Sequence, residues 1–370
     1  MKVDYRAAFI RGGTSKALVF HERDLPDDRA RWDEVFLRAM GSPDPNGRQL
    51  DGMGGGISSL SKVCVVGPPS RPDADVDYTF AQVQVDRPVV DYSGNCGNMS
   101  SAIGPFAVDE GLVRATGGEA VVHVHNVNTG KLIRATFPVE DGRSVTAGDY
   151  RIQGVSGSGA PVRLDFLDPG GSATGALLPT ATVIDRLGAV EATLVDASNP
   201  VVFADAAEFG LSATELPERI DADAGVMARL EQVRRAGSVR MGLTASEAEA
   251  GERRMTPFVA VVAAPADYTT LSGDRVAADE IDLLVRFLSN GRAHRALPLT
   301  GALCTAIAAR LPGSVVHRRS RPPGGAIRLG SPSGVLEVDA KVSASSTGFD
   351  AEYATAYRTT RRLFTGVVSV

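Results

Sequence analysis

The chain has 370 residues, 43% of them apolar and 22% charged, which is typical of a globular protein with one large or two smaller domains. Acidic residues outnumber basic ones by 44 to 39, so the net charge of −5 offers no general attraction to nucleic acid or to an anionic membrane. The best apolar stretch lies between Pro257 and Pro265 and is far shorter than a membrane span. We therefore expect neither a nucleic-acid nor a membrane partner.

The first half of the chain is rich in predicted strands, recognised by β-branched enrichment or apolar alternation. They cover 3–9, 17–20, 62–66, 76–85, 89–91, 120–127 and 132–139. The second half adds strands at 192–196, 201–204 and 258–263. Helical spacing of apolar residues predicts helices at 29–40, 99–110, 223–236, 274–288, 300–311 and 351–363. Runs of strands broken by single helices favour an α+β class over a doubly wound parallel sheet.

A change of domain is predicted near residue 185, which gives an N-terminal domain at 1–184 and a C-terminal domain at 185–370. Two segments echo each other across this boundary, SGNCGNMSSAI at 93–103 and PLTGALCTAI at 298–307. Each is a turn of small residues that opens into a small, apolar helix. We therefore predict two similar α+β domains, with the last segment of the chain packing back on the first domain.

Cysteine and histidine usage argues against a disulfide framework and a metal centre. The three cysteines, Cys64, Cys96 and Cys304, are odd in number and have no CxxC spacing. His123 and His125 alternate on one predicted strand, but no third ligand is near them in the sequence. The first residues of the chain lack an apolar segment behind a basic one, so we expect a cytoplasmic protein without a signal peptide.

The segment DYSGNCGNMSSA, at 91–102, places Cys96 between glycines and asparagines at a predicted helix start. Free N–H groups and the positive end of the helix dipole stabilise a nearby anion there and favour the thiolate form of a cysteine. An isolated cysteine is more often a small buried residue. The glycine and asparagine setting favours a catalytic role instead, since glycine lets a substrate approach the backbone.

The segment DGMGGGISSLSKVCVV, at 51–66, brings a glycine run, two serines and Lys62 to the start of an apolar strand. Its N–H and O–H groups form a suitable nest for a carboxylate or phosphate, although the P-loop spacing is not met. A partly desolvated lysine amine at a strand start can carry a proton. The competing interpretation is a surface lysine at a strand end, and Cys64 is interpreted as packing.

Three further segments offer groups for an anionic ligand. RGGTSK, at 11–16, is either a carboxylate clamp or a hairpin turn with solvated charges. LTGA, at 299–302, is another helix start suited to an anion, with Cys304 inside the helix. Asn199 and Arg240 lie in predicted loops from which they can reach a site.

Six segments, taken in order and spanning nearly the whole chain, together resemble the PrpF family of isomerases. They are RGGTSK, DGMGGGISSLSK, DVDYTFAQV, DYSGNCGNMSSAIGPFA, VRMGL and PLTGALCTA. That family includes methylaconitate isomerase, methylitaconate Δ-isomerase and 4-oxalomesaconate tautomerase, and it is related in fold to diaminopimelate epimerase. The resemblance implies two similar domains, each a sheet wrapped around a central helix, with the active site in the interdomain cleft.

Carried over motif by motif, the resemblance implies that Lys62 and Cys96 form the acid/base pair. The implied donors to substrate carboxylates are Thr14, Ser15, Ser58, Ser59, Gly97, Asn98, Thr300 and Gly301. Arg11, Asn199 and Arg240 join them as our own candidates for substrate binding. The second thiol that related racemases use falls near Pro298 in this sequence, and Cys304 is displaced into the helix, which disfavours two-thiol racemisation.

The expected function is isomerisation of an unsaturated di- or tricarboxylate, such as 2-methylaconitate, by allylic proton transfer through a stabilised dienolate. Neither a metal nor an organic cofactor is required. The alternatives are a 4-oxalomesaconate tautomerase or other 1,3-allylic isomerase, an amino-acid epimerase or racemase, and a non-catalytic carboxylate binder. The sequence leaves open the substrate, the base and acid roles, and the oligomeric state, for which a homodimer would be unsurprising.

Overall fold

The computed structural model describes residues 3–321, 324–345 and 348–370. Residue contacts divide the chain into two compact units, Met1–Phe166 with Tyr357–Val370, and Leu167–Ala356. The second unit thus begins earlier than the boundary predicted near residue 185, because the loop that follows Phe166 is tied to Asp196. The Gly171 N–H donates to the Asp196 carbonyl oxygen, and the Ser172 hydroxyl donates to its carboxylate.

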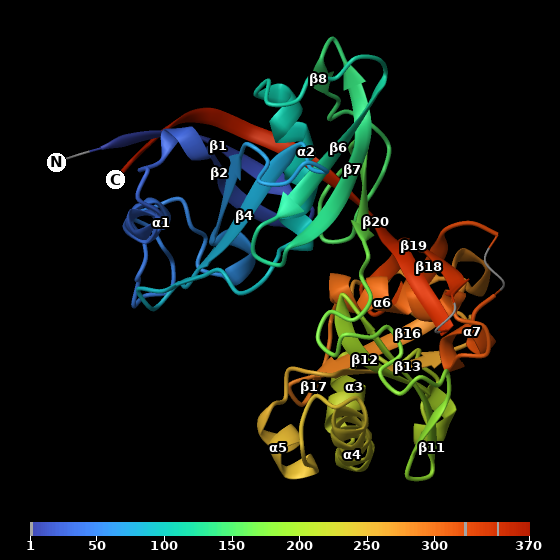
Figure 1. The fold of residues 1–370 in the computed structure, drawn as a ribbon. Coiled ribbons are helices and arrows are strands. Elements are labelled where there is room, and N and C mark those ends of the chain that lie inside the picture. The colour runs from blue at the N-terminus through green and yellow to red at the C-terminus, as the bar shows by residue number, and fades with distance from the viewer. Residues whose placement is uncertain (1–2, 322–323, 346–347) are drawn as a thin grey trace. The chain divides into compact units, whose positions relative to one another are not determined.

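The first unit is a closed ring of strands around one helix, α2 (Gly97–Asp109), as Figure 1 shows. The ring follows the order β1, β2, β3, β4, β6, β7, β9, β20 and back to β1. Its strands are β1 (Asp4–Gly12), β2 (Ser15–His21), β3 (Lys62–Gly67), β4 (Val76–Val83), β6 (Glu119–Asn126), β7 (Lys131–Glu140), β9 (Pro161–Leu167) and β20 (Gly348–Ser369). Closure leaves the ring without free strand edges.

Helix α2 is buried on all sides because nearly all of its residues are small or apolar. Met99, Ile103 and Phe106 pack into a core with inward side chains of the strands, among them Tyr78 and Phe137. The helix start is therefore held rigidly at one end of the ring, which positions the residues that follow Cys96.

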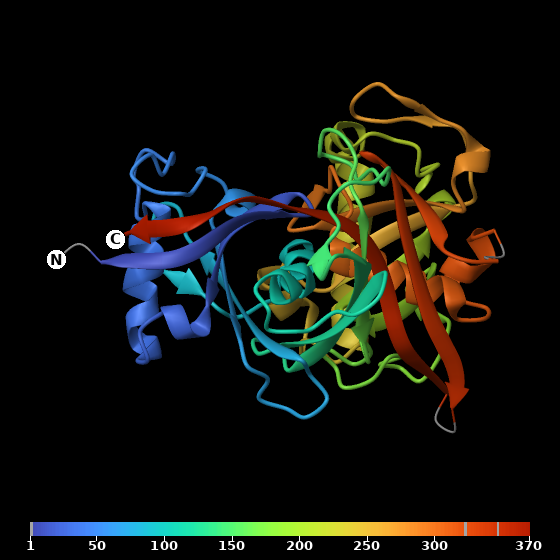
Figure 2. The same ribbon diagram turned by 90° about the horizontal axis from the view of Figure 1, so that it is seen from above.

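The outer face of the first strands is covered by α1 (Trp32–Met40), which buries Trp32 and Phe36 against them. The end of β20 runs antiparallel to β1, and Val370 pairs with Val3 just beyond these strands (Figure 2). The last segment of the chain thus belongs to the first unit. Short elements complete the unit: η1 (Glu22–Asp24), η2 (Arg29–Arg31), η3 (Ser58–Leu60), β5 (Val90–Asp91) and β8 (Arg143–Ser144).

The second unit also has a sheet packed around one helix, α6 (Leu299–Arg310), which contacts β11, β12 and β19. Its sheet follows the order β10 (Asp185–Leu187), β11 (Val190–Ala197), β12 (Asn199–Asp205), β13 (Phe258–Ala263), β16 (Leu283–Ser289), β18 (Ile327–Ser331), β19 (Gly334–Ser345) and β20. The α+β class with a sheet around a helix in each half is confirmed.

Helix α4 (Ala224–Arg240) supports the second sheet and contacts β10, β12 and β13. Its Leu230 and Val233 share a core with Val202 and Val259. The remaining elements of this unit are η4 (Ala206–Phe209), α3 (Pro217–Ala222), α5 (Glu247–Glu252), β14 (Tyr268–Thr269), β15 (Arg275–Val276), η5 (Ala278–Glu280), β17 (Arg292–Ala293) and α7 (Val315–Arg319).

Two predicted helices are wrong. Most of 274–288 forms β15, η5 and β16, and β16 is buried on both faces, so its continuous apolar run has no strand alternation to recognise. The segment 351–363 lies inside strand β20, where its tyrosines and threonines suit a strand and its alanines pack beside β19. The helices predicted at 29–40, 99–110, 223–236 and 300–311 are confirmed within a few residues.

Candidate active site

The RGGTSK segment forms the hairpin turn between β1 and β2, with Gly12 paired to Ser15. This turn lies directly against the start of α2. A Cβ atom on Gly12 would lie 2.7 Å from the Asn98 carbonyl oxygen, and one on Gly13 would lie 2.3 Å from Asn98 Oδ1. Gly13 also has a φ of +53°, which other residues adopt at a cost. The two glycines therefore allow the hairpin to touch the helix start.

Cys96 is the residue that immediately precedes α2, and it is half-buried. Its Sγ lies 4.0 Å from the hydroxyl of the buried Ser15. No side chain caps the helix, and in the described part of the chain the N–H groups of Gly97, Asn98 and Met99 have no hydrogen-bond acceptor. Three free donors and the positive end of the dipole make this helix start a site for a carboxylate.

The Asn98 side chain joins the hairpin to the last strand. Its Nδ2 donates to Thr14 Oγ1 at 3.1 Å, and its Oδ1 accepts a hydrogen bond of 3.0 Å from Arg358 Nε. The helix start, the hairpin and β20 thus meet around one amide. The sequence analysis missed Arg358, because it lies in the segment predicted to be a helix and no local motif marks it.

Lys62 begins β3 as predicted, and its side chain is buried with 8% of the residue exposed. Its Nζ donates to Gln82 Oε1 at 2.5 Å and lies 5.0 Å from the centre of the Phe80 ring. The Gln82 Nε2 donates to the carbonyl oxygens of Ser58 and Ser61, which fixes the orientation of the amide. Among the described residues, no carboxylate pairs with Lys62, so the amine is held by neutral groups only.

Both proposed catalytic groups lie near the buried Cys64 thiol. Cys64 follows Lys62 by two residues on β3 and therefore shares its face of the strand. Burial is the main reason that the pKa of the Cys64 thiol is raised, and charge on Cys96 raises it further while Lys62 lowers it. Cys64 packs in the core inside the ring, as predicted, and Cys96 packs against the same core. Lys62 lies over the ring of Phe80, which also belongs to that core.

Of the remaining predicted residues of the first unit, Arg11 binds backbone carbonyl oxygens, and Ser58 and Ser59 lie near Lys62 in the sequence. Arg11 Nη1 donates to the carbonyl oxygens of Gly13 and Thr359, both at 2.9 Å, so this side chain fastens the turn to β20. Burial lowers the pKa of Arg11, and the charge of Arg361 lowers it further. Ser58 and Ser59 lie in η3 beside Lys62, with Ser58 exposed and Ser59 half-buried.

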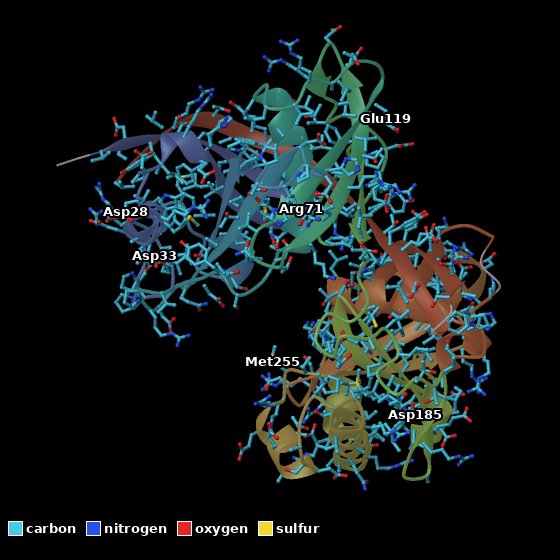
Figure 3. All side chains as sticks on the ribbon, in the orientation of Figure 1. Asp28, Asp33, Arg71, Glu119, Asp185 and Met255 are labelled. Atoms are coloured by element: carbon cyan, nitrogen blue, oxygen red, sulfur yellow. The ribbon has the colours of Figure 1, made fainter. Side chains whose placement is uncertain are left out.

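The other four predicted binding residues belong to the second unit. Thr300 and Gly301 form the first turn of α6, and a Cβ atom on Gly301 would lie 2.7 Å from the Phe287 ring. Arg240 pairs with Asp185, labelled in Figure 3, at 2.9 Å. The amide of Asn199, the first residue of β12, donates to the Pro200 carbonyl oxygen. Gly301 therefore has a packing role, and the side chains of Arg240 and Asn199 have protein partners.

A second thiol suited to proton transfer is missing from the described part of the second unit. Cys304 is fully buried inside α6, and its Sγ contacts the Val195 carbonyl oxygen at 3.7 Å. Burial raises the pKa of Cys304 well above its ordinary value. No group of three or more metal-binding side chains occurs among the described residues. No helix in 3–321, 324–345 and 348–370 is long and apolar enough to cross a membrane.

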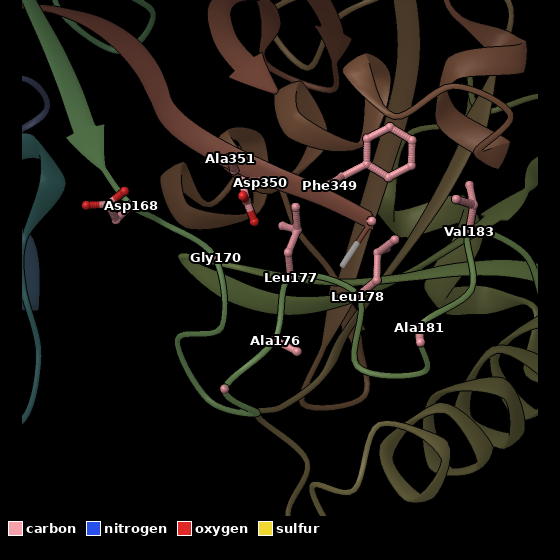
Figure 4. Close-up of a pocket in the computed structure, with 12 residues that line it drawn as sticks. Asp168, Gly170, Ala176, Leu177, Leu178, Ala181, Val183, Phe349, Asp350 and Ala351 are labelled. Atoms are coloured by element: carbon pink, nitrogen blue, oxygen red, sulfur yellow. The ribbon is translucent and has the colours of Figure 1, made fainter. Parts of the chain in front are cut away.

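A cavity of about 490 Å³ lies in the second unit, between the loop after Asp168 and the start of β20 (Figure 4). Apolar side chains line much of it, among them Leu177, Leu178, Val183 and Phe349. None of the predicted site residues lines this cavity, and it holds no cluster of groups suited to proton transfer. The chemistry-bearing residues lie instead around the start of α2.

Comparison with known proteins gives full-length matches. The model of the PrpF protein family matches residues 2–370. The chain is 42% identical to 3-methylitaconate isomerase of Eubacterium barkeri, over 98% of this chain and 96% of that protein. It is also 42% identical to 2-methyl-aconitate isomerase of Cupriavidus necator, with the same coverage of both chains.

A solved structure described as methylitaconate-delta-isomerase superposes with a TM-score of 0.94 at 40% identity. The match covers 100% of this chain and 96% of that one, so it includes both units. Similarity of this extent in sequence and in fold leaves no part of the chain outside the match. The chain belongs to the PrpF family and is an isomerase.

Proposed function

We propose that this isomerase moves an allylic proton of an unsaturated di- or tricarboxylate, with Lys62 and Cys96 as the proton-transferring groups. The observation that supports the proposal is that a buried amine and a half-buried thiol at an uncapped helix start both lie against the core inside one ring of strands. The substrate class follows the similar proteins, whose names specify 3-methylitaconate and 2-methyl-aconitate.

The surroundings of Lys62 suit a group that gains and loses a proton. A lysine next to a carboxylate stays protonated, whereas Lys62 has the neutral amide of Gln82 and the Phe80 ring as its partners. A buried amine held only by neutral groups can carry a proton to and from a substrate. Either Lys62 or Cys96 can act as the base, and the other then acts as the acid.

The reaction needs stabilisation of negative charge more than it needs a strong base. When the base takes the γ-proton, the electron pair of that C–H bond spreads over the double bond onto a carboxylate as a dienolate. The free N–H groups of Gly97, Asn98 and Met99 and the Ser15 hydroxyl are suited to that carboxylate. Such preorganised donors are typically the largest catalytic contribution.

The second step returns a proton to carbon. The acid of the pair donates to the other end of the allyl system, which shifts the double bond, or to the original carbon after rotation, which changes the geometry. The substrate gains one proton and loses one: the base holds the γ-proton, and the acid has given its own proton to carbon. Proton exchange with solvent returns both groups to their starting states. No external oxidant or reductant enters this scheme.

Proton NMR in D₂O tests the proposal with 2-methyl-trans-aconitate, methylitaconate, trans-aconitate and 4-oxalomesaconate in parallel. We expect loss of the allylic proton signal together with a new isomer for at least one of them. Lys62→Met and Cys96→Ala should each lower the rate by about 100-fold or more, the usual contribution of a general acid or base. Lys341→Met, an exposed lysine paired with Glu352, is the matched control.

Three outcomes would redirect the assignment. Wild-type rates in both variants would refute the roles of Lys62 and Cys96. Binding of all four carboxylates without exchange would indicate a carboxylate-binding protein. Inversion at an amino-acid Cα would indicate an epimerase, which the buried Cys304 disfavours because it offers no opposed thiol.

A further inference from the structure

Arg358 is a buried arginine that has no acidic partner in the part of the chain that the structure describes. Only 7% of it is exposed, and no carboxylate within the described ranges forms an ion pair with it. Arg234, which is also buried, pairs with Glu231 at 2.7 Å. Arg286 likewise has no ion pair to a described carboxylate, but it lies in the second unit and donates to three carbonyl oxygens there. A buried guanidinium without a counter-charge is costly, which points to an anion that is supplied from outside the chain.

The guanidinium of Arg358 is held in place but not saturated. Nε donates to Asn98 Oδ1 at 3.0 Å, and Nη1 donates to the Tyr357 carbonyl oxygen at 2.8 Å. Nη2 makes no hydrogen bond to any residue that the structure describes. The Cδ of Arg358 also lies 3.1 Å from the Cβ position of Gly13, so the hairpin restrains the side chain. A restrained cation with a free edge is preorganised for a ligand.

The surroundings of Arg358 are those of the proposed active site. Its partner Asn98 lies in the first turn of α2, next to the free N–H groups. Burial lowers the pKa of Arg358 to about 10, while Tyr150 and Cys96 oppose this effect through their charges. The hydrogen bond to Asn98, two residues after Cys96, places the guanidinium beside the helix start.

We infer that Arg358 binds one carboxylate of the substrate through Nη2, while the N–H groups at the start of α2 bind another. This assignment rests on the proposed function and makes Arg358 a specificity-determining residue. It explains why substrates of this site should carry at least two carboxylates: one satisfies the helix start, and the second neutralises the buried guanidinium. A monocarboxylate would leave one of these two groups unpaired.

Titration calorimetry with itaconate and its two monomethyl esters tests the inference without requiring turnover. In the wild type, each ester should bind at least about tenfold more weakly than itaconate, since each lacks one charge-assisted contact. In Arg358→Gln, the ester that lacks the Arg358-bound carboxylate should bind within about threefold of itaconate, while the other ester keeps its penalty. Arg114→Gln, an exposed arginine of the same unit, should match the wild type.

The pattern separates ligand contact from structural damage. Damage to the site would weaken itaconate and both esters alike and leave their ratios unchanged, so unchanged ester penalties in Arg358→Gln would overturn the inference. Wild-type protein that binds neither itaconate nor its esters would also overturn it. If the wild type exchanges deuterium but Arg358→Gln binds both esters as weakly relative to itaconate as the wild type does, the role of Arg358 is refuted and the proposed function is not.

A second measurement tests the inference on the wild-type protein, so it applies even if Arg358→Gln fails to fold. A crystal structure of the wild-type protein with itaconate should place a carboxylate oxygen within about 3.2 Å of Arg358 Nη2. A ligand bound at the start of α2 with Nη2 facing only solvent would overturn the inference. Binding without deuterium exchange would count against the proposed function and not against the role of Arg358.

Discussion

Replacement of Gln82 by methionine should impair catalysis although Gln82 itself transfers no proton. The amide of Gln82 is the hydrogen-bond partner of Lys62 Nζ, at 2.5 Å, and its own orientation is set by bonds to the carbonyl oxygens of Ser58 and Ser61. Methionine has a similar length and no donor or acceptor of comparable strength. Gln82→Met therefore removes the group that holds the amine and leaves the amine itself in place.

The size of the effect follows from the bonds that are lost. A hydrogen bond to a charged group contributes about 1.5 to 3 kcal/mol, so misplacement of Lys62 should lower kcat/KM by about 10- to 150-fold. The two bonds to carbonyl oxygens, at 3.1 and 2.8 Å, contribute about 1 kcal/mol each, so with the bond to Lys62 the free energy of unfolding should fall by about 3.5 to 5 kcal/mol. Unfolding is measured separately because lost stability does not lower kcat/KM while the protein stays folded.

Deuterium incorporation followed by NMR gives kcat/KM, and urea unfolding gives stability. Gln84→Met is the matched control, since Gln84 lies two residues further along and its side chain has no hydrogen bond to a described residue. A folded Gln82→Met protein with kcat/KM within about threefold of the wild type would refute the reasoning that Gln82 holds Lys62 in its reactive position.

Two further predictions concern stability. Gly13→Ala should lower the free energy of unfolding by more than the roughly 1 kcal/mol of a positive φ alone, because its Cβ would lie 2.3 Å from Asn98 Oδ1. Gly142→Ala is the control, since Gly142 has a φ of +72° and open space around it, and this variant should lose only about 1 kcal/mol. Equal losses in urea unfolding would contradict the close approach of Gly13 to Asn98. Burial is the main cause that lowers the pKa of His21, so the unfolded chain binds this proton more tightly. The free energy of unfolding should therefore fall as pH drops below about 6.5, by up to about 1.4 kcal/mol per pH unit, and His21→Gln should flatten this slope while His294, lowered in the same sense, keeps part of it. Parallel curves for the two proteins would exclude His21 as the source.

The local motifs were read correctly where local geometry decides the outcome. The small residues around Cys96 predicted a helix start, and a hairpin turn was one of the two interpretations of RGGTSK, because both features depend on a few consecutive residues. Lys62 was singled out because it begins an apolar strand after a segment rich in glycine and serine, and its catalytic role was implied by the resemblance to the PrpF family. The roles assigned to these residues stay predictions until the variants are measured.

Long-range pairing explains what the sequence analysis missed. The strand β20 contains alanines at helical spacing, and only its partners β1 and β19 reveal that it is extended. Gln82 was overlooked because its importance comes from pairing with Lys62 in register across β3 and β4. The continuous apolar run of β16 was interpreted as a helix because burial on both faces removes the alternation that marks a strand.

The closure of the ring links these missed elements to the chemistry. Strand β20 pairs with β1 near the chain terminus and thereby carries Arg358 to Asn98, 260 positions earlier in the sequence. The same closure brings Thr359 to Arg11, so the hairpin that touches the helix start is fastened by the strand that supplies the cation. The misassigned segment therefore hid both the strand that closes the ring and the proposed second carboxylate contact. The site at the helix start is built from residues of both strands that close the ring, β1 and β20. These strands lie at opposite ends of the chain, so the spacing of residues in the sequence cannot group the site residues.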